Sequence, residues 1–237
     1  LVRNFVFQRL DAEGADTKKA YREDWPFETK FWMREVSVGR NLVSRSSLFL
    51  NQWLVARTGE EVSPQATFNR FKSWVELESG QTMADLLPTI KHQAQQYEAW
   101  THAAAQHGGS LDSASMAFYR MRASGVEVLK PLLIWLYEPG RDLPQQTVAR
   151  IVQAAESWVY RRQMLRLSGG DLGRIVADVI AASVGVSTNE LSERVIGHLA
   201  RLNVTSTYWP GDEEVRLSLG TEAVYSRFPR GRLRMFL

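Results

Sequence analysis

The stretch MADLLPTIKHQAQQYEAWTHAA, from Met83 to Ala104, decides the fold class of this chain. Its apolar positions recur every three or four residues, and this spacing places them on one face of an α-helix. The positions of this face are Met83, Leu86, Leu87, Ile90, Ala94, Tyr97, Thr101 and Ala104. Polar residues such as Lys91 and Gln95 fall between them, on the face that meets water. The stretch therefore predicts one amphipathic helix with a length of about 33 Å.

The same helical spacing recurs at residues 148–159, 175–180 and 191–199. No segment alternates apolar and polar residues for long enough to predict a central strand. The only short candidate is LNVTSTYW, from Leu202 to Trp209. We therefore predict an all-α fold, a multi-helix array with orthogonal or bundle-like packing and at most one short strand pair near residues 202–220.

Helix starts and breaks agree with this prediction. Ser63 followed by Pro64 is typical of a helix start, and Ser187 with Glu190 has the form of a capping box. The string WPGDEE, which begins at Trp209, combines proline with three carboxylates, which a helix N-terminus favours. Glycine pairs and Pro-Gly steps mark the expected breaks between helices.

A soft boundary is expected around Pro139 to Pro144. We predict a front helical array over residues 1–140 and a smaller, more basic helical lobe over residues 141–237, although the two could form one continuous domain. The formal net charge is +3, and the excess lies after the boundary. Arginine greatly outnumbers lysine. Arginine binds phosphate through two parallel hydrogen bonds, but a GC-rich genome would also enrich arginine throughout a protein.

Composition excludes several classes of protein. The 237 residues are 44% hydrophobic and 23% charged, which is typical of a folded globular chain. The most apolar segment, residues 126–137, is interrupted by Glu127, Lys130 and Pro131, so no membrane span is predicted. The chain has no cysteine, which excludes disulfides and thiolate chemistry and fits a cytoplasmic location.

Both ends of the sequence are apolar. The first residue is Leu1 rather than methionine, and the last residues, Phe236 and Leu237, fall inside a helical pattern. We therefore expect this chain to be the central part of a longer protein.

The search for a catalytic or metal site gives a negative prediction. The spacing of the four histidines, His92, His102, His107 and His198, does not place two of them on one helix face as a zinc motif requires. No phosphate-binding loop and no nucleophile elbow is present, because the SGGD string at Ser168 follows a helix and lacks the lysine. We predict no catalytic residue, no metal ligand and no cofactor in this chain.

Two arginine clusters are the candidate binding residues. The first lies near a helix C-terminus, and the second has no acidic residue within it. The clusters consist of Arg161, Arg162 and Arg166, and of Arg227, Arg230, Arg232 and Arg234. We predict contacts with the DNA backbone, which would weaken steeply as salt increases. Cations at a helix C-terminus also stabilise the exposed carbonyl groups, and the second cluster could be a solvated face.

Five stretches resemble, in consistent order, the helical middle of the GmrSD-type family. They are LVRNFVFQRL at Leu1, WPFETKFW at Trp25, FNRFKSWV at Phe68, the residues from Glu156 to Ile175, and the residues from Trp209 to Leu237. The members are bacterial anti-phage, modification-dependent restriction endonucleases. They join an N-terminal, ParB-like, nucleotide-hydrolysing domain to a C-terminal HNH nuclease domain. The resemblance covers nearly the whole chain.

The resemblance implies that this chain is the scaffold between those two domains. The family's DGQQR and His-Asn-His motifs are absent here, so the NTP and divalent metal that they use are assigned to the parent protein. Arg3 and Asn4 match a motif that borders the nucleotide domain, and we expect them to brace it. The implied partners are modified DNA and the two flanking domains, with no membrane, and the oligomeric state stays open.

Two alternatives belong to a different class of protein. Residues Asp171 to Leu219 could form the helices, short strand and wing of a non-enzymatic winged-helix DNA-binding regulator. The chain could also be a helical interaction module.

Overall fold

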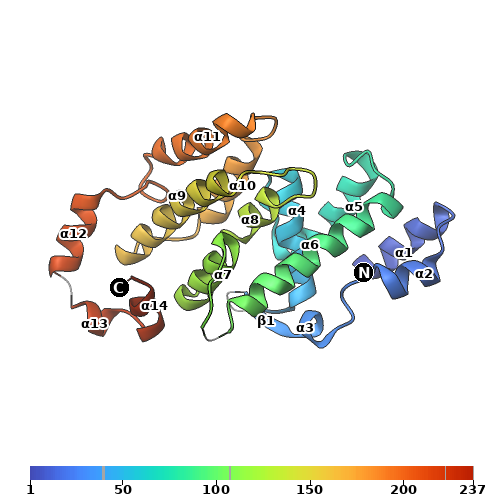
Figure 1. The fold of residues 1–237 in the computed structure, drawn as a ribbon, viewed down its shortest axis with the longest axis horizontal. Helices are drawn as coiled ribbons and strands as arrows, with labels where there is room; N and C mark the ends of the chain where they lie inside the picture. Colours follow the sequence, from blue (N-terminus) through green and yellow to red (C-terminus); the bar gives the residue numbers. More distant parts are fainter. Residues whose placement is uncertain (39–40, 107, 222, 237) are drawn as a thin grey trace.

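The computed structural model of the protein describes residues 1–38, 41–106, 108–221 and 223–236. The predicted all-α fold is confirmed, since 67% of the chain is helical. The N-terminal helices lie at one end of the long axis and the C-terminal helices at the other (Figure 1). The described helices are α1 (Val2–Ala12), α2 (Thr17–Glu23), α3 (Lys30–Met33), α4 (Arg45–Thr58), α5 (Thr67–Leu77), α6 (Met83–Ala103), α7 (Ser113–Ser124), α8 (Lys130–Leu136), α9 (Gln145–Met164), α10 (Leu172–Ala181), α11 (Thr188–Ala200), α12 (Asp212–Thr221), α13 (Val224–Arg227) and α14 (Arg230–Phe236), with a 3-10 turn at Pro64–Ala66.

The long helix predicted from Met83 is α6, and its apolar face is buried as expected. Its start is fixed twice. The Thr82 side chain accepts a hydrogen bond from the amide of Asp85, and the Glu13 carboxylate accepts from the amides of Met83 (2.9 Å) and Ala84 (3.1 Å). The second contact fastens the end of α1 to the positive end of α6.

The centre of the core is α4. Phe49, Trp53 and Leu54 are fully buried, and α4 packs against α3, α5, α8 and α10. Inside this shell Trp53 Nε1 donates to Gln93 Oε1 at 2.8 Å, and Gln93 Nε2 donates to the carbonyl of Ile134 at 2.8 Å. One amide side chain therefore joins α4, α6 and α8.

The strand pair lies elsewhere than predicted. β1 (Glu35–Val38) and β2 (Asn41–Ser44) are antiparallel, with Val36 opposite Val43. Residues 202–209 form a loop between α11 and α12. Carbonyl oxygens of this loop accept hydrogen bonds from the side chains of Trp158 and Arg162 on α9, so it needs no neighbouring strand.

The boundary predicted near residues 139–144 falls in the turn between α8 and α9. The buried residues on its two sides belong to one hydrophobic cluster, which extends from Phe5 to Leu199. α8 packs against both α4 and α10, and α7 packs against both α6 and α9. The two parts thus share a core. Among the described helices, none has the length and apolar composition that crossing a membrane requires.

Candidate nucleic-acid interface

Arg162 is buried, with 1% of its surface exposed, and it faces the loop between α11 and α12. Its Nη1 donates to the carbonyl of Tyr208 at 2.8 Å, and its Nη2 donates to those of Ser206 (2.7 Å) and Ser168 (3.0 Å). Burial lowers the pKa of the guanidinium, against the opposing influence of Tyr208 and Asp171. Its two terminal nitrogens donate to carbonyl groups inside the fold, so Arg162 does not present them to a DNA phosphate.

Arg161, its neighbour, is also engaged. Its Nη1 donates to the carbonyl of Pro210 at 3.0 Å, and its Nη2 forms an ion pair with Asp212 in the first turn of α12. Asp212 is one of the carboxylates that the sequence placed at a helix start. Arg161 therefore fastens the beginning of α12 to the end of α9.

The second arginine cluster contacts the body of the protein through Arg232, which binds the carbonyl of Ser124, the last residue of α7. The Ser124 carbonyl accepts hydrogen bonds from Arg232 (3.1 Å to Nη2) and from Gln163 (3.2 Å to Nε2). α14 lies close to α7 here, because a Cβ added at Gly231 would be 3.3 Å from the Ala123 carbonyl oxygen. The Ser124 carbonyl thus joins the end of α7 to the end of α9 and to α14. The sequence had predicted the arginine clusters of α9 and α14 as separate groups.

Arg166, Arg230 and Arg234 are among the exposed arginines at this end of the molecule. None of the described carboxylates forms an ion pair with them. Arg166 closes α9 with φ of 56°, in the left-handed region that a side chain rarely adopts. Arg227, at the end of α13, is also exposed. We define Arg166, Arg230 and Arg234 as the α9–α14 surface.

At the opposite end of the molecule, Arg3 and Asn4 lie in the first turn of α1 and are both exposed. Arg3 Nη1 forms an ion pair with Glu28 at 3.1 Å, and Glu28 also accepts a hydrogen bond from Trp25. These contacts link α1 to the loop before α3. Both side chains are thus accessible to an adjoining domain. Their role in bracing the nucleotide domain stays a prediction.

The described residues contain no group of three or more histidine, aspartate or glutamate side chains that could hold a metal ion. His102 lies 3.5 Å from Glu98 one turn earlier on α6, and burial lowers the pKa of His198. His107 lies outside the described residues. His102 and His198 thus lie singly on α6 and α11.

One group of charged side chains was not identified from the sequence. Arg45 and Lys130 line a cleft between β1, α4, α6 and α7, together with Arg34 and Arg122. A signal was present, because Lys130 stands inside the otherwise apolar string VLKPLLIWL. A lysine in such a string predicts a buried ammonium group with partners. The arginines that lie beside Lys130 are determined by the packing of β1, α4, α6 and α7, which the sequence does not specify.

No protein-family model matches this chain, and neither a curated protein nor a solved structure matches it.

Proposed function

We propose that this chain is a stiff helical scaffold that lays its C-terminal end along the phosphate backbone of duplex DNA. In the fuller form of the proposal, it is the central part of a GmrSD-type, modification-dependent restriction endonuclease. There it would link a nucleotide-hydrolysing domain, at the Arg3 and Asn4 end, to an HNH nuclease after α14. The DNA contact rests on the α9–α14 surface, and the wider assignment rests on the resemblance of the five stretches.

The observation that carries the proposal is the junction at Ser124. It holds Arg232 of α14 and Gln163 of α9 on one carbonyl oxygen, so the exposed Arg166, Arg230 and Arg234 belong to one end of the molecule. Guanidinium groups bind phosphate oxygens in pairs, and such contacts position a protein on DNA without reading its sequence. The shared core behind this end supports a fixed distance between the two ends.

The winged-helix alternative has less support. All residues from 171 to 219 are described, and they form α10, α11, a loop and part of α12, with no strand to build a wing. A helical interaction module remains the second candidate, because exposed α12 and α13 bury no residue and could face a protein instead of DNA.

A titration of duplex DNA at several salt concentrations tests the DNA contact. We expect binding that weakens steeply between about 50 and 300 mM salt. Replacement of Arg166, Arg230 and Arg234 by glutamine should lower the slope of log affinity against log salt by about one unit for each phosphate that the variant no longer neutralises.

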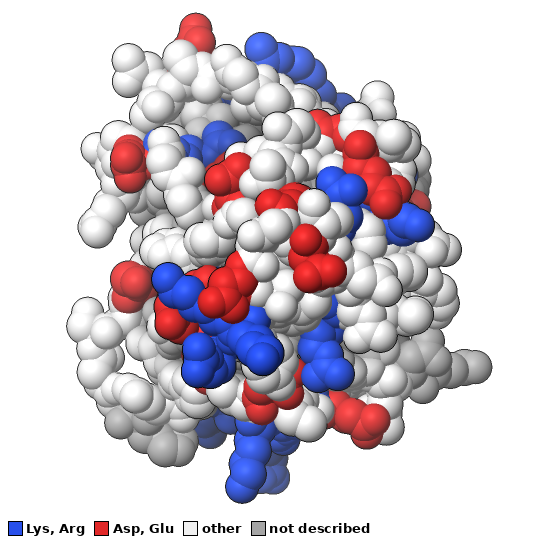
Figure 2. Space-filling view, turned by 90° about the vertical axis from the view of Figure 1, so that its right-hand side faces the viewer, with Lys and Arg blue, Asp and Glu red and all other residues white. Residues whose placement is uncertain are grey.

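The matched control removes three positive charges from the other end of the molecule. Lys18, Lys19 and Arg22 are exposed on α2. On the face of the molecule at this end, basic and acidic side chains lie side by side (Figure 2). Their replacement by glutamine should leave the slope nearly unchanged. An equal loss of affinity in both triple variants would show a nonspecific effect of net charge and would contradict the proposed surface.

A further inference from the structure

A cleft at the middle of the molecule collects more positive charge than its own carboxylates balance. It has a volume of about 610 Å³ and lies between β1, the start of α4, the end of α6 and α7. Four cations line it, Arg34, Arg45, Arg122 and Lys130, against two carboxylates, Glu35 and Glu127. Four minus two leaves a surplus of two positive charges. A phosphate monoester carries a charge close to −2 near neutral pH.

Lys130 is held deep in this cleft as a charged group. Its side chain is 9% exposed, and its Nζ donates to the hydroxyl of Tyr97 at 2.9 Å and pairs with Glu127 at 2.9 Å. Burial lowers the pKa of Lys130, but Tyr97 and Glu127 outweigh burial, so the pKa lies above its usual value. The hydrogen bond to Tyr97 and the ion pair with Glu127 hold the ammonium in place inside the cleft.

The neighbouring arginines are fixed by carbonyl groups rather than by carboxylates. Arg45 Nη1 donates to the carbonyl of Phe31 at 3.2 Å, and its guanidinium lies 4.0 Å from the centre of the Phe31 ring. Arg122 Nη1 donates to the carbonyl of Ala104 at 3.2 Å. Each arginine has further N–H groups, and no described carboxylate forms an ion pair with either. Such preoriented donors suit an oxyanion, since little freedom is lost on binding.

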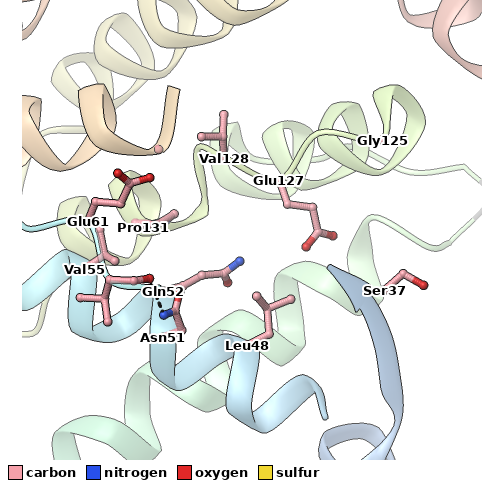
Figure 3. Close-up of a pocket in the computed structure, with 12 residues that line it drawn as sticks. Ser37, Leu48, Asn51, Gln52, Val55, Glu61, Gly125, Glu127, Val128 and Pro131 are labelled. Carbon is pink, nitrogen blue, oxygen red and sulfur yellow. Dashed lines mark hydrogen bonds between the residues drawn. The ribbon is translucent and has the colours of Figure 1, made fainter. Parts of the chain in front are cut away.

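A second cavity continues from the cleft and is less charged. It has a volume of about 380 Å³, and it shares Ser37, Leu48 and Glu127 with the basic cleft. Figure 3 shows Gln52 reaching from α4 toward the segment that carries Glu127 and Pro131. Val55, Val128 and Pro131 give part of its wall an apolar character, and Glu61 adds a second carboxylate beside Glu127.

The side-chain amide of Gln52 is the feature of this second cavity that indicates a ligand. Only 6% of the residue is exposed, yet its amide oxygen has no hydrogen-bond partner among the described residues. Its neighbour Asn51 donates to the carbonyl of Val62 and to the hydroxyl of Thr67, both at 2.9 Å. A buried amide oxygen without a partner destabilises a fold unless something hydrogen-bonds to it.

We propose that the two cavities form one binding site for a small phosphorylated molecule. Its phosphate group would lie among Arg45, Arg122 and Lys130, and its uncharged, hydroxyl-bearing body would extend along α4 to Gln52. This inference is independent of the proposed DNA contact, which uses other residues at the C-terminal end.

Calorimetric titrations with inorganic phosphate, ribose 5-phosphate and ribose test this site. We expect ribose 5-phosphate to bind more tightly than inorganic phosphate, and ribose not to bind. Arg122→Gln and Arg45→Gln should each weaken both phosphate ligands by about tenfold, the effect of losing one charge-assisted hydrogen bond. Gln52→Leu should weaken ribose 5-phosphate alone. Arg150→Gln, an exposed arginine on α9 that pairs with Glu193, is the matched control and should change nothing.

Each outcome decides part of the proposal. Absence of phosphate binding, or unchanged affinity in Arg122→Gln, overturns it, and Arg122 is exposed enough for that variant to fold even if Arg45→Gln does not. Equal effects of Gln52→Leu on both phosphate ligands would remove the second cavity from the site. A short duplex with a 5′-phosphate should not compete with ribose 5-phosphate, and competition would show that the cleft receives a DNA end instead.

Discussion

The Arg162 side chain donates hydrogen bonds to backbone carbonyls of the loop between α11 and α12. A neighbouring strand would otherwise have to supply these donors. The planar group of Arg162 reaches the carbonyls of Tyr208, Ser206 and Ser168 at once, and it does so with 1% of its surface exposed. Hydrogen bonds to charged groups are stronger than neutral ones, and a buried carbonyl without a partner is unfavourable. Trp158 holds one further carbonyl of this loop, that of Thr207, so Arg162 is its main but not its only donor.

We predict that Arg162→Met lowers the free energy of unfolding by about 3 kcal/mol or more, because several buried carbonyls lose their donor. Arg162→Lys should recover little, since an ammonium group cannot reproduce the planar fork. Arg161→Met should lower the free energy of unfolding by about 1 kcal/mol or less, because its ion pair with Asp212 is partly exposed. Urea denaturation of the three variants measures these differences, and equal losses at the two positions would contradict the assigned roles.

Glu156 gives a pH-dependent prediction. It is 4% exposed, accepts a hydrogen bond from Arg120 at 2.7 Å, and its pKa is raised by burial more than Arg120 lowers it. The folded state thus holds this proton more tightly than the unfolded state. The resulting stability is fully present below about pH 4.5, the ordinary value of the group, and is lost as the pH rises through its folded pKa.

The measurement compares the wild type with Glu156→Gln, which does not titrate. Between about pH 4 and 7, the free energy of unfolding of the wild type should fall relative to that of the variant. Parallel curves for Glu156→Gln would mean that burial does not perturb this carboxyl group.

The sequence could not distinguish the two adjacent arginines of α9. Both stand in the same last turn, and the helical period is a local signal that assigns neither to a particular partner. What separates them is the loop between α11 and α12, which offers Arg162 the carbonyls of Ser206 and Tyr208, 44 and 46 residues further along the chain, but offers Arg161 that of Pro210 alone. Interactions between residues so distant in sequence are set by packing, which one sequence does not specify.

At the scale of elements, helices were predictable and their partners were not. α6 begins at Met83 as predicted and ends at Ala103, because its apolar period and the Thr82 cap are local properties. α11 begins after Ser187 as predicted, although the Ser187 hydroxyl donates to the Glu190 carboxylate instead of accepting a backbone amide. The strands at Glu35–Val38 and Asn41–Ser44 are four residues each, too short for an alternating pattern to stand out.

The contact between α4 and α10 gives a prediction for one glycine. Gly59 ends α4 with φ of 64°, and a Cβ placed there would be 2.8 Å from the Cβ of Ala181 on α10. Gly125 ends α7 with φ of 73°, and nothing lies within 4 Å of a Cβ placed there. The two positions share the left-handed backbone but differ in the space around them.

We expect Gly125→Ala to lower the free energy of unfolding by about 1 kcal/mol, from the left-handed backbone alone. Gly59→Ala should lower it by roughly 1 to 3 kcal/mol more, because α10 must move away from α4. Thermal or urea denaturation compares the two variants directly. Similar losses would show that α10 yields without cost, and the close approach of the two helices would then contribute little to the core.

At the scale of the whole molecule, α7 lies between the two proposed sites. Its Arg122 lines the basic cleft, and its last residue, Ser124, holds α14 and the end of α9. A ligand in the cleft would contact Arg122, and Ser124, two residues further along α7, holds α14 and the end of α9, which carry the proposed DNA surface. This arrangement offers a short physical connection between the two sites, which the separate arginine clusters of the sequence did not indicate.

The shared core leads to a prediction about how the molecule opens. α4, α6 and α9 contribute buried residues to one cluster, whereas α12 and α13 bury none and α14 buries Leu233 alone. In native-state hydrogen exchange, the slowest amides of α4, α6 and α9 should exchange with one common free energy, that of global unfolding. Amides of α12 and α13 should exchange at least about a hundredfold faster, since their opening exposes little apolar surface. If instead α9, α10 and α11 exchanged together at a lower free energy than α4 and α6, the region after residue 140 would be a separate cooperative unit, and a single stiff scaffold could not connect the two ends.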